Sequence, residues 1–197
     1  MVSPAAFLRG HGLKPPARIL DLGCGTGSQA QVLAGEGFRV TAADIDFDAV
    51  ATGRELLATS TSFAESNSRR PDFLPDFVAA DAVSLPFPDA CFDAVACVDV
   101  LHWSPHREAF RALWNEAWRV LGRGGLFAVR SLLRDALPTG MPLNEGRYRL
   151  ASGAEWFLPA QADFEALLAA CAGEWAQAPV ALPDGHGAAW LIARKIA

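Results

Sequence analysis

The chain has 197 residues, enough for one domain with a substantial core, and its 51% apolar and 20% charged residues exclude a disordered chain. Its net charge of -5 argues against a protein that binds a phosphate backbone, so we expect no nucleic-acid partner. No apolar run reaches membrane-spanning length and no basic-then-apolar leader opens the chain, so a cytoplasmic protein without a membrane partner is expected.

Short β-rich runs alternate with helical patterns in the first half of the chain. They predict strands at 17–23, 39–45, 77–80 and 93–101, and helices at 28–37 and 46–59. Asp46 suits the cap of the second helix. Residues 61–76 are polar, contain two prolines and are typical of a long loop.

The clearest helical pattern follows in the second half. Ser104 suits its cap and Pro105 its first position, and the glycines from Gly122 onward are expected to end it. The rest predicts a strand at 126–133, a long loop, a helix at 162–173 and an antiparallel closing pair at 177–182 and 188–196. This alternation of strands and helices predicts one α/β domain over 1–197 with a mainly parallel sheet. Ligands of such sheets bind at the carboxyl ends of the strands.

A glycine loop follows the first strand. The pattern is D-x-G-x-G-x-G, from Asp21 to Gly27. The dinucleotide fingerprint G-x-G-x-x-G requires its third glycine one residue later, where Ser28 stands. The spacing therefore disfavours an NAD-dependent oxidoreductase, although glycines in a tight turn also have a purely conformational explanation.

Acidic residues stand at three successive strand ends. Asp44 can accept hydrogen bonds from both hydroxyls of a ribose, and Asp81 from an adenine amino group while the N–H of Ala82 donates to a ring nitrogen. Asp21 can help to hold an ammonium group. The set suits a ligand with a sugar, a base and a cationic tail, and it would repel a pyrophosphate. Each acid alone is also explained as a cap or a turn former.

Five segments within residues 17–132 resemble the motifs of a known family. In chain order they are ILDLGCGTG, VTAAD, AADAVSLPFPDACFDAV, VDVLHW and EAWRVLGRGGLFAV. Together they resemble class I S-adenosylmethionine-dependent methyltransferases, and most closely the small-molecule group that includes the ubiquinone and menaquinone methyltransferases. The resemblance implies a Rossmann-like sheet of seven strands in the order 3-2-1-4-5-7-6, with strand 7 antiparallel and helices on both faces.

The resemblance also implies S-adenosylmethionine as the cofactor. The loop from Gly23 to Gly27 would wrap its methionine part, with a contact from Thr26, and Ile45 would pack on the adenine. The end of the fourth strand near Val98 would contact the methionine part through backbone. With the acids, the expected cofactor-binding residues are Asp21, Gly23, Gly25, Thr26, Gly27, Asp44, Ile45, Asp81, Ala82 and Val98.

The acceptor side is expected after the fourth strand. His102 is the candidate catalytic base because its ordinary pKa suits proton transfer near neutrality. Its alternative role is to shape the pocket, and Trp103, Tyr148 and Trp156 are the other candidate substrate-binding residues. His106 lies four residues from His102, but Pro105 starts the helix between them, so we expect no metal. The reaction expected is methyl transfer to a small-molecule acceptor.

One departure from the family concerns the lid. Only the short segment 1–16 precedes the first strand, whereas the family usually has a longer segment over the substrate. Either the pocket is open, or the segment 134–160 supplies the lid, or the sequence is truncated at its start. A non-catalytic S-adenosylmethionine-binding protein remains the alternative from another functional class, and the sequence leaves the oligomeric state open.

Overall fold

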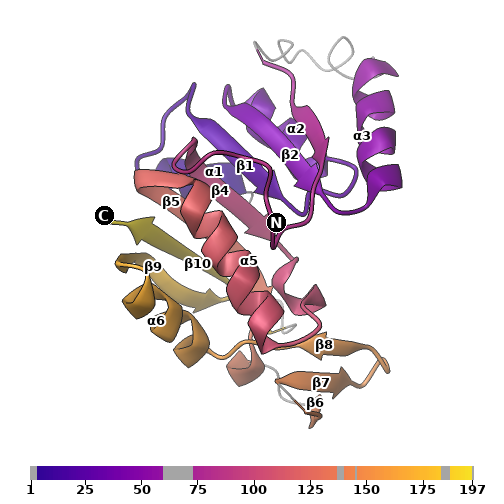
Figure 1. The fold of residues 1–197 in the computed structure, drawn as a ribbon, viewed down its shortest axis with the longest axis vertical. Coiled ribbons are helices and arrows are strands. Elements are labelled where there is room, and N and C mark those ends of the chain that lie inside the picture. Colours follow the sequence, from indigo (N-terminus) through magenta and orange to yellow (C-terminus); the bar gives the residue numbers. More distant parts are fainter. Residues whose placement is uncertain (1–3, 60–72, 137–139, 145, 183–186, 197) are drawn as a thin grey trace.

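The computed structural model describes residues 4–59, 73–136, 140–144, 146–182 and 187–196, and most of the predicted loop 61–76 lies outside this part. A sheet of seven strands runs through the molecule in the order β3-β2-β1-β4-β5-β10-β9 (Figure 1). Its strands are β1 (Arg18–Leu22), β2 (Arg39–Asp44), β3 (Asp76–Ala79), β4 (Phe92–Val98), β5 (Leu121–Leu132), β9 (Gly173–Ala181) and β10 (Ala188–Lys195). The first five pair in parallel, and β10 is antiparallel to both neighbours. The predicted order and the antiparallel last strand are confirmed.

Helices cover both faces of this sheet (Figure 1). One face carries α1 (Pro4–Gly10), α2 (Ser28–Gly35) and α3 (Phe47–Thr59), and the other carries α5 (Arg107–Val120) and α6 (Gln161–Ala170). Each face of the sheet has its own hydrophobic core, and successive strand residues pack into opposite cores. Ile19 of β1 packs on the α2 side, whereas Leu20 packs on the α5 side. Among the helices described, none is long and apolar enough to cross a membrane.

The start of α5 differs from the prediction. The helix begins at Arg107, and the imidazole of His106 caps it by accepting a hydrogen bond from the backbone N–H of Ala109 at 3.2 Å. Ser104, the predicted cap, has the extended ψ of 128° that a residue before proline favours. The predicted start was wrong because a histidine takes the capping role that the sequence pattern assigns to a serine.

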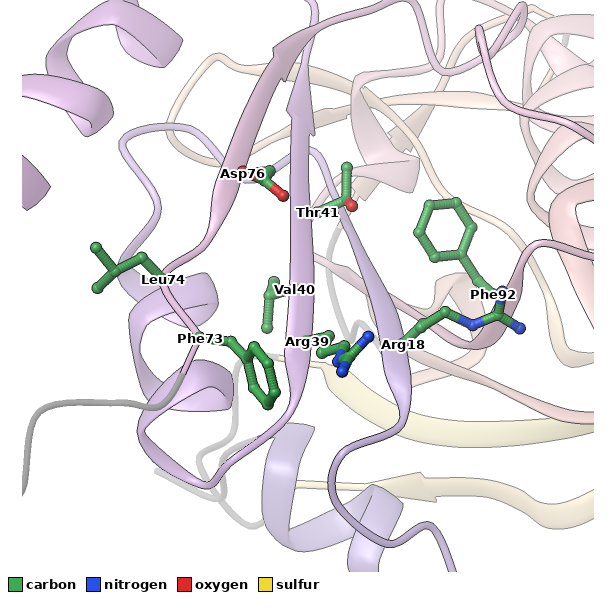
Figure 2. Close-up of a pocket in the computed structure, with 8 residues that line it drawn as sticks. All are labelled: Arg18, Arg39, Val40, Thr41, Phe73, Leu74, Asp76 and Phe92. Atoms are coloured by element: carbon green, nitrogen blue, oxygen red, sulfur yellow. The ribbon is translucent and has the colours of Figure 1, made fainter.

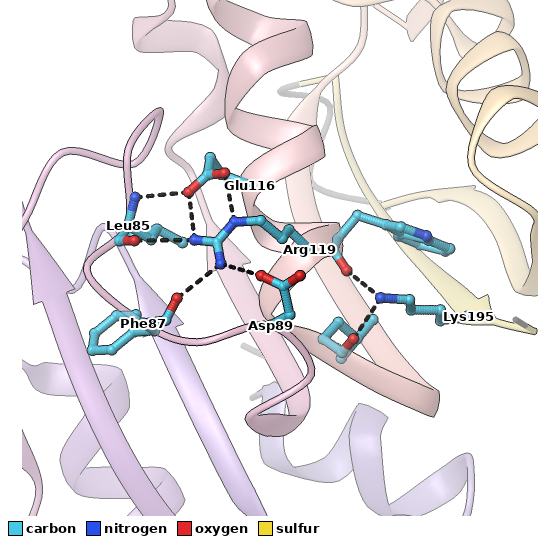
Figure 3. Close-up of polar contacts among 8 residues, drawn as sticks. Leu85, Phe87, Asp89, Glu116, Arg119 and Lys195 are labelled. Carbon is cyan, nitrogen blue, oxygen red and sulfur yellow. Dashed lines mark hydrogen bonds and ion pairs between the residues drawn. The ribbon is translucent and has the colours of Figure 1, made fainter.

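The end of α5 also differs, because the helix stops at Val120 and the glycines that follow lie inside β5. Lys195 donates hydrogen bonds to the carbonyl oxygens of Trp118 and Leu121, each at 2.7 Å (Figure 3). A lysine from the last strand therefore satisfies helix-end carbonyls that a glycine cap would otherwise satisfy.

Arg119 ties α5 to the segment before β4 (Figure 3). Its guanidinium pairs with Glu116 and Asp89, and it donates to the carbonyl oxygens of Leu85 and Phe87. Glu116 in turn accepts from the backbone N–H of Leu85 at 2.8 Å. This network fixes the chain that leads from the end of β3 into the central strand.

The segment between β5 and α6 is partly regular, although the sequence predicts a loop there. It contains η2 (Arg134–Ala136) and a small antiparallel sheet of β6 (Gly140–Pro142), β7 (Arg147–Leu150) and β8 (Glu155–Phe157). These strands have only three or four residues, too few for an alternating pattern to be recognised. Glu155 of the outer strand β8 pairs with Arg147 and Arg149 of the central strand β7, which ties these two strands together.

Candidate active site

A cavity of about 420 Å³ opens at the carboxyl ends of β1 to β4. It is lined by Leu22, Gly23, Gly25, Ala43, Asp44, Ile45, Asp46, Ala80, Asp81, Ala82, Asp99, Val100 and Trp103. Seven of these thirteen are residues that the sequence predicts for cofactor or substrate contacts: Gly23, Gly25, Asp44, Ile45, Asp81, Ala82 and Trp103. The topology therefore brings residues from four strand ends to one hollow.

The glycines of the loop are required for two different reasons, packing within the protein and space in the cavity. Gly23, Gly25 and Gly27 all have positive φ, at 75°, 54° and 85°. A Cβ on Gly23 would lie 2.2 Å from Val100, and one on Gly27 would lie 2.3 Å from Phe77, so packing within the protein excludes side chains there. A Cβ on Gly25 would meet nothing within 4 Å. Gly25 therefore leaves room in the cavity itself.

Asp44 holds this loop against the end of β2. Its carboxylate accepts the backbone N–H of Gly25 at 2.7 Å through Oδ2 and that of Asp46 at 3.0 Å through Oδ1. Each carboxylate oxygen has a second lone pair, so the group can also accept from a ligand. Asp81 is arranged similarly and accepts the N–H of Val83 at 3.0 Å. Ile45, which is 71% exposed, offers an apolar face beside the two acids.

Asp21 lies behind the glycine loop and does not line the cavity. It is buried, its Oδ2 has no hydrogen-bond partner in the described structure, and the backbone N–H of Ala30 donates to its carboxylate. Because Ala30 is in the first turn of α2 and the N-cap Gly27 has no side chain, Asp21 supplies the missing cap. Burial raises the pKa of Asp21 to about 7, against the lowering effect of the Ala30 hydrogen bond.

Three further predicted contacts also lie off the cavity lining. Thr26 and Gly27 turn into α2, and Val98 packs against the core on the α2 side. The end of β4 reaches the cavity through Asp99 and Val100 instead. The predicted strand 93–101 is too long, because β4 ends at Val98 and the apolar run gives no sign that Asp99 adopts a left-handed φ of 60° and turns the chain there.

The acceptor-side residues gather at η1 (Leu101–Trp103), next to the cavity. The ring of His102 lies 5.3 Å from that of Trp103 and 4.6 Å from that of Trp156 in β8, centroid to centroid. Tyr148 of β7 stands opposite Trp156 in the strand register, and its side chain is hydrogen-bonded to Arg134. Strand β8 therefore carries an aromatic ring from a distant segment to the end of β4.

His102 is buried, at 6% exposure, and its Nδ1 has no hydrogen-bond partner among the described residues. Burial lowers the pKa of His102, Asp99 opposes this effect, and Arg130 adds to it. The imidazole is therefore neutral at pH 7 and has the capacity to accept a proton. The ranges that the structure describes contain no group of three or more His, Cys, Asp or Glu side chains arranged to hold a metal ion.

A second cavity, of about 580 Å³, lies at the opposite edge of the sheet, where the strands begin (Figure 2). It is larger, but the chemistry there is different. Arg18 is engaged by Asp93 at 3.1 Å, and the guanidinium of Arg39 lies over the ring of Phe73 at 4.5 Å. Because parallel sheets bind ligands at the carboxyl ends of their strands, we assign the functional site to the smaller cavity.

Comparison with known proteins points to one class of fold and chemistry. The model of the family described as "Methyltransferase domain" matches residues 20–129. The chain is 33% identical to a 27-O-demethylrifamycin SV methyltransferase of Amycolatopsis mediterranei over 70% of this chain and 46% of that protein. It is 40% identical to a demethylmenaquinone methyltransferase of Beutenbergia cavernae over 46% of this chain and 31% of that protein. The chain thus spans less than half the length of either relative.

A solved structure resembles the whole fold. It is described as a SAM-dependent methyltransferase of Methanosarcina mazei, and it superposes with a TM-score of 0.81 over 99% of both chains at 21% identity. Similarity at this low level of identity establishes the architecture, which includes the sheet edge on which the cavity lies.

Proposed function

Since the chain belongs to the methyltransferase domain family, whose model matches residues 20–129 of its 197, we propose that it transfers a methyl group from S-adenosylmethionine to a small-molecule acceptor. The observation that carries the proposal is the arrangement of acids and glycines around one cavity. Asp44, Ile45, Asp81 and Ala82 suit an adenosine over β2 and β3, and the space beside Gly25 suits a methionine part over β1 and β4.

The same geometry disfavours a dinucleotide. A pyrophosphate requires free backbone N–H groups at the first glycine turn and the following helix end. Here the N–H of Gly25 is donated to Asp44, and Asp21 accepts from the first turn of α2. Two carboxylates therefore occupy the donors that a phosphate would use, whereas a zwitterion with an ammonium group is compatible with them.

Methyl transfer requires the protein to position the acceptor and, for some acceptors, to remove one proton from it. The sulfonium of bound S-adenosylmethionine would supply an already activated methyl group. The chain must hold an acceptor in line and exclude water, for which the rings of Trp103 and Trp156 beside the cavity are suited. A hydroxyl or amine acceptor also loses a proton. A neutral imidazole nitrogen of His102, which neighbours the lining residue Trp103, is our candidate to accept it.

The acceptor class rests on the relatives and on the rings. The two relatives named above are methyltransferases of demethylrifamycin SV and demethylmenaquinone, both small molecules. The aromatic group of His102, Trp103 and Trp156 offers flat apolar surface rather than the charged surface that a nucleic acid needs. We also propose a cytoplasmic location, which is supported by four cysteines that form no disulfide.

Calorimetry with S-adenosylmethionine, S-adenosylhomocysteine and NAD tests the cofactor. The first two should bind and NAD should not. Asp44→Ala should weaken both adenosyl ligands by roughly tenfold or more, because it removes an acceptor for two ribose hydroxyls. Asp76→Ala, at the opposite edge of the sheet, is the matched control and should leave both affinities unchanged. Binding of NAD alone would overturn the proposal.

A methyl-release assay with small aromatic hydroxyl and amine acceptors then tests turnover. Release of S-adenosylhomocysteine that depends on an acceptor identifies an enzyme. Tight binding of the cofactor without turnover on any acceptor would favour the alternative, a non-catalytic binding protein.

A further inference from the structure

We propose that Asp99, held by Arg130 at the end of β4, makes the cavity discriminate between the positively charged cofactor and its uncharged product. This inference rests on the proposed function, because it concerns the same cavity. It adds Asp99, which is not among the residues predicted from the sequence, and assigns it a role in product release.

The backbone of Asp99 has an unusual conformation that Arg130 holds in place. It has a φ of 60°, in the left-handed region that non-glycine residues rarely adopt and that Asp and Asn tolerate best. Its backbone N–H donates to the carbonyl oxygen of Arg130 at 2.9 Å, and its carboxylate forms an ion pair with the Arg130 guanidinium. One residue of β5 thus fixes both the main chain and the side chain of Asp99. Unusual backbone held in this way is typical of functional sites.

The place of Asp99 along the sheet edge is the second observation. In sheet order the cavity meets Asp81 after β3, Asp44 at the end of β2, Gly23 after β1 and Asp99 after β4. With adenosine over β2 and β3, the sulfur-bearing part of the ligand lies toward β1 and β4. The Asp99 side chain is 40% exposed while that of Arg130 is only 14% exposed, so the carboxylate, rather than the guanidinium, is the accessible charge at this end.

The two ligands differ in charge, so the Asp99 carboxylate interacts with them differently. S-adenosylmethionine carries a sulfonium, and S-adenosylhomocysteine differs from it by one methyl group and that positive charge. A carboxylate near the sulfur therefore favours the first ligand over the second, whereas contacts to ribose, adenine and the ammonium group serve both equally. Arg130 moderates this attraction by pairing with the same carboxylate. Loss of the methyl group removes the attraction, which promotes release of the product.

Asp99→Asn is the sharpest test, because asparagine keeps the shape of the side chain and tolerates the same backbone conformation. Calorimetry should show the affinity ratio of S-adenosylmethionine to S-adenosylhomocysteine falling by about threefold or more at low ionic strength. Asp44→Asn is the control, since the ribose is common to both ligands. It should weaken both by the same factor and leave the ratio unchanged.

Arg130→Gln should move the ratio in the opposite direction, because it removes the moderating cation. In the unmodified protein the ratio should fall with added salt, a measurement that does not depend on the folding of any variant. An unchanged ratio in Asp99→Asn, or a ratio indifferent to salt, would overturn the inference and leave the proposed function intact. Absence of binding by either adenosyl ligand to the unmodified protein would instead overturn the proposed function.

Discussion

At the scale of single residues, three features of His102 bear on its proposed role as a general base. It is buried, its pKa is lowered by that burial, and its ring contacts those of Trp103 and Trp156 at the edge of the cavity. The lowered pKa keeps it neutral over the physiological range, so the fraction able to accept a proton is high. The same contacts would also let His102 serve only to shape the pocket.

Substitution of His102 separates these roles. If it is the base, His102→Ala should reduce kcat by roughly 10²–10⁴ with an acceptor that loses a proton, while cofactor affinity stays within about threefold. The rate of the unmodified enzyme should fall as the pH drops through the lowered pKa of His102, and the variant should lack this fall. If His102→Asn instead keeps kcat and raises KM, the residue shapes the pocket and is not the base.

The raised pKa of Asp21 leads to a prediction about how stability depends on pH. Burial raises its pKa to about 7 in the folded protein, from 3.8 in the unfolded chain. Between these values the folded state binds the additional proton, so the contribution of Asp21 to stability is lost as pH rises from about 4 to about 7. Asp21→Asn should therefore raise the Tm more at about pH 8 than at about pH 5, with an upper limit near 4 kcal/mol in the free energy of unfolding.

Glu55→Gln, at an exposed position of α3, is the control for this measurement and should show the same Tm difference at both pH values. A Tm difference for Asp21→Asn that is independent of pH would mean that Asp21 is ionised in the folded protein. Its carboxylate would then have a stronger partner than the single N–H of Ala30.

The sequence predicts the candidate site unevenly at this scale. Asp44 and Asp81 are found because acids at the ends of buried strands are unusual and the sheet topology brings such ends together. Asp99 is missed because its role depends on the pairing of β4 with β5 and on a left-handed backbone, neither of which leaves a local pattern. The burial of Asp21 is missed for a related reason, since its neighbour Ala30 becomes a partner only when α2 packs on the sheet.

At the scale of elements, β8 brings Trp156 to the ring of His102. Trp156→Ala should raise the KM for the acceptor by up to roughly tenfold, because an aromatic contact of this kind contributes about 0.5–1.5 kcal/mol, and the affinity for cofactor should not change. Trp175→Ala, a half-buried tryptophan of β9, is the matched control and should leave that KM unchanged. A KM for Trp156→Ala equal to that of the unmodified enzyme would place the acceptor away from this sheet.

Element boundaries show where local reasoning stops. The cap of α3 is correctly predicted, because Asp46 accepts the N–H groups of Asp48 and Ala49 a few residues along the chain. The end of α5 is wrongly predicted, because its partner Lys195 lies more than seventy positions later. The aspartate cap of α3 is visible in the sequence, whereas the histidine cap of α5 and the lysine that closes its other end are visible only in the fold.

At the scale of the whole molecule, hydrophobic patterning predicts a mainly parallel sheet and the family resemblance implies its strand order. The structure confirms both, and the comparisons confirm the family. The short first segment has a different role from the one expected of a family lid. In α1, Leu8 is fully buried and Phe7 stacks on Trp190 of β10 with ring centroids 4.7 Å apart. The first helix thus packs into the core on the α2 face, together with the last strand.

Leu8→Ala tests this assignment. Removing a fully buried leucine should lower the free energy of unfolding by about 2–4 kcal/mol, measured by denaturant titration, whereas Leu56→Ala at a half-exposed position of α3 should cost far less. The folded fraction of Leu8→Ala should still bind S-adenosylhomocysteine with unchanged affinity, because Leu8 belongs to the core and not to the cavity lining. A loss of affinity without a loss of stability would instead mean that the first helix contributes to the binding site. Any covering of the acceptor would then involve both this helix and the small sheet that carries Trp156.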